Sequence, residues 1–206
     1  MNLRSRLVLL VSCWAVLALL LALGGALARA PGPLIPALIF GLPAAAVLAH
    51  RRIAPLRAWV AAFDPRLAMA FHLVRIPFGL AFLREAAEGT LPLAFARVAG
   101  PGDVVAGGLV LLALVAAGDL RVPARRAIVL AWNALGLLDM LLVVATAQRL
   151  VIFVQDPRMQ GTLGRFPYAV LPTFVVPMIL ISHLAVFARL ARPHASSEGA
   201  YPSGAA

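Results

Sequence analysis

Five polar side chains lie within long apolar stretches of the sequence, where polar groups are unusual. His72 and Arg75 share one stretch, Asn133 and Asp139 share another, and His183 lies in a third. An ionisable group costs several kcal/mol inside a membrane unless it is paired or hydrated. These five residues are therefore the candidate ligand-binding residues of the chain.

The spacing of these residues predicts two polar layers in a helical bundle. His72 and Arg75 are three apart and share one helix face. At about 1.5 Å per residue, His72, Asn133 and His183 fall in the inner third of their spans. Arg75 and Asp139 fall nearer the midplane. If the helices are neighbours, this predicts a His–Asn–His layer and an Arg75–Asp139 ion pair. Such a pair either locks two helices together or forms a ligand, substrate or proton site.

Catalytic motifs give no support to an enzyme. The G-x-S-x-G and H-E-x-x-H patterns are absent, and the chain has no lysine for a Schiff base or a P-loop. Only Asp139 is deep in a predicted span, whereas an aspartyl intramembrane protease needs two facing aspartates. Glu85 and Glu88 could act as acid and base, but a solvated helix end is the simpler interpretation. We predict no catalytic residue.

The same residues bear on cofactors and metals. His72 and His183 share a depth, so a b-type haem with two axial histidines is an alternative. Two histidines without a carboxylate in their layer make a poor metal site, and we predict none. Cys13 is the only cysteine, which excludes an intrachain disulfide and a cysteine-based metal cluster.

Composition places the chain in a membrane. Of the 206 residues, 63% are hydrophobic and 13% are charged, whereas soluble domains carry about 25% charged residues. The net charge is +10, and all 18 basic residues are arginine. A nucleic-acid-binding protein would need a basic face on a soluble module, and none is visible. The excess of arginine is typical of a membrane protein whose loops set its topology.

Hydropathy predicts an all-α, polytopic bundle of about six spans. They cover about residues 7–28, 33–49, 67–83, 102–118, 127–147 and 168–188. The first could instead be a cleaved signal peptide. Internal prolines predict kinks in the second and sixth spans. Residues 53–66 are expected to form an interfacial helix, and 84–103 and 155–167 to form loops. Residues 1–192 would make one transmembrane domain, and 193–206 a disordered tail.

The arginines also predict an orientation. With both termini in the cytoplasm, 11 arginines lie inside and 6 outside, and Arg75 lies within the membrane. This bias favours an N-in, C-in protein of a bacterial inner membrane.

Several short motifs carry a resemblance to a known group. They are Arg75-x-x-x-Gly79-x-x-Phe82-Leu83, Gly89-x-Leu91-Pro92, Ala99-Gly100-x-Gly102-Asp103 and Trp132-Asn133-x-x-Gly136-x-x-Asp139. The chain resembles, over about residues 70–190, a group of uncharacterised bacterial polytopic inner-membrane proteins. Its 75–83 portion is also similar to the DoxX-like family. The first resemblance implies that residues 95–103 form a structured, functional loop.

Three functions stay open. The first is binding or moving a small ligand or ion through the intramembrane polar residues. The second is a non-catalytic accessory subunit, with a membrane-protein partner or a homo-oligomer as its context. The third is a b-type haem protein. In all three the lipid bilayer is a partner, and nucleic acid is not.

Overall fold

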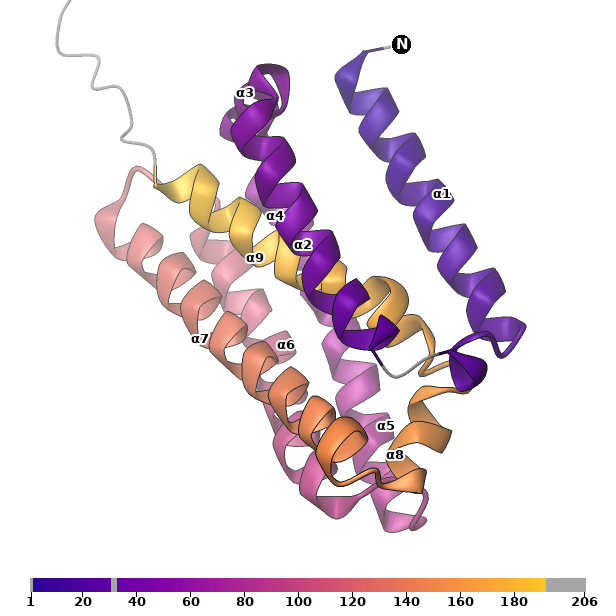
Figure 1. The fold of residues 1–206 in the computed structure, drawn as a ribbon. Coiled ribbons are helices and arrows are strands. Elements are labelled where there is room, and N and C mark those ends of the chain that lie inside the picture. The colour runs from indigo at the N-terminus through magenta and orange to yellow at the C-terminus, as the bar shows by residue number, and fades with distance from the viewer. Residues whose placement is uncertain (1, 31–32, 192–206) are drawn as a thin grey trace, which may run out of the picture.

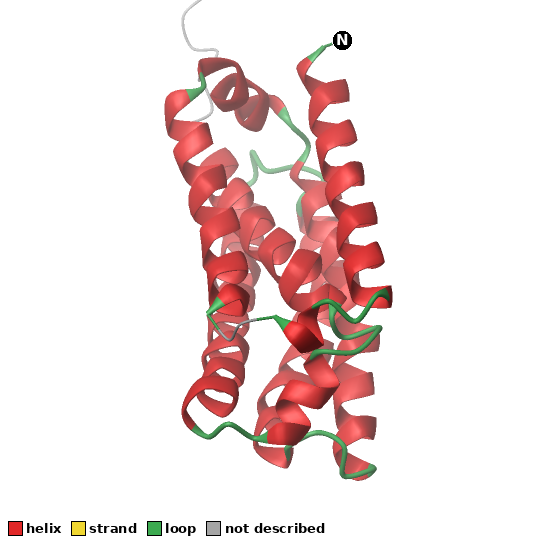
Figure 2. Cartoon of the chain, turned by 45° about the vertical axis from the view of Figure 1, so that its right-hand side comes forward, coloured by secondary structure: helices red, strands yellow, loops and turns green. Residues whose placement is uncertain are grey.

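The computed structural model describes residues 2–30 and 33–191, and this part of the chain is built from helices (Figures 1 and 2). Six helical segments are long and apolar enough to cross a membrane: Leu3–Leu23, Leu34–Arg52, Pro65–Ala87, Leu93–Ala116, Pro123–Phe153 and Leu171–Leu190. Many large apolar side chains face outward, among them Leu10, Leu20 and Val115. The chain is therefore an integral membrane protein whose outer surface contacts the lipid bilayer.

The first two spans differ from their predicted bounds at their ends. Helix α1 covers Leu3–Leu23, begins at an Asn2 cap, and stops at Gly24-Gly25 rather than at residue 28. Gly25 has φ +64°, a conformation that favours glycine and ends a helix. A short 3₁₀ turn, η1 (Leu27–Arg29), follows. Helix α2 (Leu34–Arg52) continues through Pro43 and ends in the basic run that the sequence marks as its boundary.

A short helix, α3 (Ala54–Ala62), occupies most of the segment that was expected to lie at the interface. Trp59 and Phe63 stack there, with ring centroids 5.4 Å apart. Asp64 then caps helix α4 (Pro65–Ala70), and its carboxylate accepts hydrogen bonds from the Arg66 backbone and guanidinium. The third span therefore begins a little earlier than predicted.

The predicted loop over residues 84–103 is wrong. The third span runs from α4 through a 3₁₀ turn, η2 (Phe71–Val74), into α5 (Arg75–Ala87). After a tight turn at Gly89, helix α6 already begins at Leu93 and continues to Ala116, through Pro101. Proline removes one helical hydrogen bond, but membrane helices tolerate this where neighbours pack closely. Residues 95–103 are therefore helix, so the structured loop expected there is also wrong.

The last two spans contain π-helical turns. Helix α7 (Pro123–Gln148) passes into η3 (Arg149–Phe153), and η4 (Leu171–Val175) passes into α9 (Val176–Leu190). Between them the predicted loop contains a short helix, α8 (Pro157–Leu163), capped by Asp156. Such turns often occur at functional sites, and η4 begins beside Pro172.

Helices α5, α6 and α7 pack side by side, and α9 crosses between them and α2 (Figure 1). Glycines allow the closest approach, because a Cβ on Gly79 would lie 2.7 Å from the Gly100 carbonyl oxygen. Helix α1 stands apart from this bundle in Figure 1. Its main polar tie is Trp14, whose indole donates to the Thr173 carbonyl over 2.8 Å.

The two ends of the bundle differ in charge. We call the end at which α1 begins and α9 ends the terminal end, and the opposite end, with α8, the loop end (Figure 1). The basic run of α2 and the arginines that open α7 belong to the terminal end. The N-in, C-in orientation stays a prediction. The predicted tail lies outside the described residues.

Candidate functional site

Arg75 is the first residue of α5 and points into the centre of the bundle. Its side chain is 1% exposed. The 3₁₀ turn that precedes it places His72 one turn away on the same side of the span. Gly107 of α6 lies against this turn, since a Cβ there would be 3.3 Å from the His72 carbonyl oxygen. Close α5–α6 packing therefore fixes where both side chains lie.

Two carboxylates and one carbonyl bind the Arg75 guanidinium. Nε donates to Asp103 Oδ1 over 2.7 Å, and Nη2 forms an ion pair with Asp139 Oδ2. Nη1 donates to the Gly136 carbonyl over 3.2 Å. The structure thus brings Arg75 and Asp139 together and adds Asp103. The interpretation that Asp139 is the only deep aspartate is wrong, because Asp103 is 4% exposed inside α6.

Glycine makes room for this cluster on both sides. A Cβ on Gly102 would lie 2.1 Å from Asp139 Oδ1. The Asp139 carboxylate of α7 therefore packs against α6 at a position that has no side chain. A Cβ on Gly136 would lie 2.9 Å from His183 Cε1 and 3.7 Å from Arg75 Nη1. The charged cluster and the histidines therefore meet at Gly136. The two predicted layers form one continuous polar site.

The histidine layer is held by a reciprocal contact between α7 and α9. His183 Nδ1 lies 2.9 Å from Asn133 Oδ1, and Asn133 Nδ2 donates to the His183 carbonyl over 3.1 Å. The amide oxygen can only accept, so His183 carries its proton on Nδ1. His183 Nε2 is then a bare lone pair, and it has no partner among the described residues.

His72 also has one ring nitrogen without a proton, because of its contact with Ser182. Its Nε2 lies 2.6 Å from Ser182 Oγ, and that hydroxyl donates its one proton to the Ile179 carbonyl over 2.7 Å. His72 must then donate from Nε2, which leaves Nδ1 as a bare lone pair. That nitrogen also has no partner within the described part of the chain. The site therefore holds two buried imidazoles, each with an unused acceptor.

Trp132 packs against this layer. Its indole donates to the Ala106 carbonyl over 3.1 Å, and its ring lies 5.0 Å from His72 and 5.8 Å from His183 between centroids. Trp132 also belongs to a buried apolar cluster with Met69, Val129 and Val186.

The histidine geometry does not fit a b-type haem. The two ring centroids are 4.3 Å apart and the rings meet edge to face. Axial ligands must lie on opposite faces of a porphyrin, and rings already in van der Waals contact leave no gap for that plane. The donor set suits a metal no better, because in the described residues no group of three His, Cys, Asp or Glu side chains is close enough to hold one.

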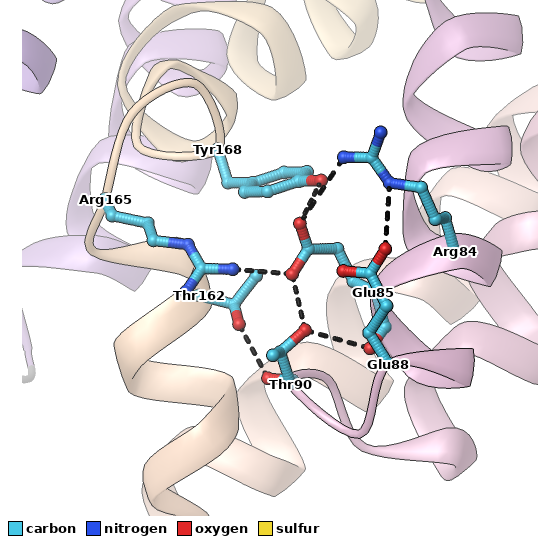
Figure 3. Close-up of polar contacts among 7 residues, drawn as sticks. All are labelled: Arg84, Glu85, Glu88, Thr90, Thr162, Arg165 and Tyr168. Atoms are coloured by element: carbon cyan, nitrogen blue, oxygen red, sulfur yellow. Dashed lines mark hydrogen bonds and ion pairs between the residues drawn. The ribbon is translucent and has the colours of Figure 1, made fainter.

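A second polar cluster, absent from the prediction, closes the loop end (Figure 3). Glu85 accepts hydrogen bonds from Thr90 Oγ1 and Arg165 Nη2, each over 2.5 Å, and from the Tyr168 hydroxyl over 3.0 Å. It is 6% exposed, so the interpretation as a solvated helix end is wrong for Glu85. It suits Glu88, whose side chain is 56% exposed.

This cluster fastens α5 to the segment after α8. Thr162 adds a hydrogen bond of 2.8 Å to the Thr90 carbonyl. Burial and the neighbouring Glu85 carboxylate raise the pKa of Tyr168 above its ordinary value. Glu85 thus links α5 to Thr90 and to the segment that contains Arg165 and Tyr168.

Comparison with known proteins identifies a family without assigning an activity. Residues 33–191 match the DUF8737 family, described as a domain of unknown function. The chain belongs to this family. No curated protein and no solved structure matches it significantly. The matched region contains both polar clusters and leaves α1 outside.

Proposed function

We propose that this DUF8737 protein binds and moves a small cation, the proton foremost, through the polar site around Arg75. The observation that carries the proposal is the charge of the cluster. One guanidinium faces two carboxylates, Asp103 and Asp139, so the fully ionised cluster holds one excess negative charge. An isolated charge at the centre of a membrane costs roughly 3 kcal/mol or more. A proton or a bound cation removes that cost.

The histidines support the same proposal. The unpartnered lone pairs of His72 and His183 are acceptors in a dry environment, where an unused polar group is costly. Either nitrogen can accept a hydrogen bond from the water shell of a cation that enters the site. His183 and Arg75 both lie close to Gly136, so such a cation would also be near the acidic pair.

Access is supported by uneven burial of the two acids. The Asp103 side chain is 6% exposed, whereas that of Asp139, which lies against Gly102 of α6, is 24% exposed. Asp139 is therefore the acid that exchanges with the surroundings, and Asp103 holds Arg75 in place. We also infer that the protein works in a bacterial inner membrane with both termini in the cytoplasm, as the arginine bias predicts.

Two measurements on the reconstituted protein test this function. Infrared spectroscopy should show the C=O band of a protonated carboxylic acid, which Asp139→Asn and Asp103→Asn each remove. Vesicles with a trapped pH dye should acidify under an imposed gradient with the wild type and not with Asp139→Asn. Asp156→Asn is the matched control, because Asp156 only caps α8 and pairs with Arg158.

The outcomes separate proton from sodium. A carboxylic-acid band with dye acidification supports a proton site. Sodium uptake that needs Asp139, without the band, supports a metal cation at the same site. If neither flux nor band depends on either aspartate, the proposed function is wrong.

A further inference from the structure

A hollow of about 490 Å³ opens at the loop end, between η1, α2, η3 and α8. That volume lies in the range of small-molecule sites, roughly 300–1,000 Å³. Its walls are mostly small or apolar, and no charged side chain lines it among the described residues. Two amides, Gln155 and Gln160, supply its polar side-chain groups.

A narrow apolar slot of about 50 Å³ lies deeper in the bundle, between α2, α5, α7 and α9. Three phenylalanines, Phe78, Phe82 and Phe95, form one wall of the slot. Ile35, Val151 and Leu163 line both spaces, so the slot and the hollow adjoin at these three side chains.

The deep end of the slot reaches the charged cluster. Arg75 and Asp103 are its charged lining residues within the described chain. Three of the five guanidinium N–H groups already have acceptors, in Asp103, Gly136 and Asp139. A polar group that entered the slot would lose its water between apolar walls, which is unfavourable.

We propose that the hollow and the slot together bind a single-chain amphiphile with an uncharged, hydrogen-bonding head. Its apolar tail fills the slot, where burial contributes roughly 25 cal/mol per Å². Its head stays in the hollow, where the Gln155 and Gln160 amides can both donate and accept. The uncharged lining disfavours an ionised head, and the narrow slot admits one chain rather than two.

This site goes beyond the proposed cation site, although the two adjoin. A bound tail would end against Arg75 and Asp103 and would exclude water from that side of the cluster. Asp139 does not line the slot, so its replacement should leave amphiphile binding intact. Failure of one proposal is thus separable from failure of the other.

The test uses the full chain in nanodiscs and two photoreactive monoacylglycerols. One carries a diazirine at the end of its tail, and the other carries it on the glycerol head. After illumination, cross-links are mapped by mass spectrometry. The tail probe should label slot residues such as Met140, and the head probe should label residues 155–164. An excess of unlabelled monoacylglycerol should suppress both.

Two substitutions and a matched control sharpen the result. Val143→Phe fills the slot and should lower tail labelling roughly tenfold, the effect of about 1.4 kcal/mol. Leu142→Phe, on the next residue, faces outward and should change nothing. Gln160→Leu lies on the exposed surface of α8 and should weaken head labelling roughly fivefold, the effect of one lost hydrogen bond. Asp139→Asn should keep both labels.

Three results would overturn the proposal. The first is head-probe labelling of the slot residues with tail-probe labelling of residues 155–164. The second is labelling that spreads over lipid-facing residues and resists competition. The third is wild-type labelling of both Val143→Phe and Gln160→Leu.

Discussion

The contact between Gly102 and Asp139 makes a sharp prediction about the charged cluster. In Gly102→Ala the new Cβ would lie 2.1 Å from Asp139 Oδ1 and 2.9 Å from its Cγ. Asp139 is short and paired with Arg75, so its carboxylate can move away only by loosening that ion pair. Overpacking costs about 1–3 kcal/mol. Complete loss of a buried pair costs about 3–5 kcal/mol, which is the upper limit here.

Helix α6 supplies a matched control. Gly108→Ala makes the same chemical change on the same helix, and nothing lies within 4 Å of the Cβ it adds. Alanine is the better helix former by about 1 kcal/mol, so this variant should be as stable as the wild type or more so. The free energy of unfolding should be measured in mixed micelles, by titration with a denaturing detergent and circular dichroism.

A double-mutant cycle isolates the contact. In an Asp139→Ala background the carboxylate is gone, and Gly102→Ala should then cost less than about 1 kcal/mol. Two results would refute the reasoning. The first is a Gly102→Ala variant as stable as Gly108→Ala. The second is an equal loss of unfolding free energy from Gly102→Ala with and without Asp139.

Three further predictions concern the two polar clusters. Arg75→Met leaves two carboxylates without their cation and should lower the free energy of unfolding by about 3–5 kcal/mol. The triple variant that adds Asp103→Asn and Asp139→Asn should regain most of this loss. Equal stability of the single and triple variants in detergent unfolding would argue against a charge effect. Tyr168→Phe removes a hydrogen bond to the Glu85 carboxylate and should cost about 1.5–3 kcal/mol by the same method. The raised pKa of Tyr168 means that the folded state keeps the phenol proton to higher pH than the unfolded state does. This part of the stability is therefore complete below the unfolded value of 10.0 and is lost as the pH rises from there through the higher folded pKa. Tyrosinate absorbance, as the difference between wild type and Tyr168→Phe, should titrate above 10.0.

The sequence predicts the membrane class and the polar residues well, because apolar length and isolated ionisable groups are local signals. It places His72, Arg75, Asn133, Asp139 and His183 inside spans, and the structure brings all five together. Which helices are neighbours depends on the whole fold and not on local sequence. The sequence therefore predicts the Arg75–Asp139 pair and the His–Asn–His layer only on the condition that their helices are adjacent. Binding by these residues stays a prediction.

Asp103 was missed because Gly100, Pro101 and Gly102 suggest a turn by the rules of soluble proteins. In a membrane the same residues pack helices closely, and proline is tolerated within a span. The signal that could have found Asp103 is the length of the stretch. Residues 93–116 are apolar except for Arg97 and Asp103, which is enough to cross the bilayer.

Glu85 was missed for another reason. Its partners follow about 80 positions later: Arg165 lies in the predicted loop 155–167, and Tyr168 is the first residue of the predicted sixth span. No periodicity connects the two regions. A pair of acidic residues at a helix end is usually solvated, and only the folded chain shows which of the two is covered.

The separation of α1 from the bundle has a consequence for how the chain enters the membrane. Helices α2 to α9 supply five of the six spans, and both polar clusters lie in them. An odd number of spans would put the start of α2 and the end of α9 on opposite sides. In the predicted N-in, C-in orientation, the two arginines before the apolar run of α1 stay in the cytoplasm, and α1 sets the direction in which the later helices cross the membrane. We therefore predict that α1 acts during insertion, whereas the later helices form the interior of the protein.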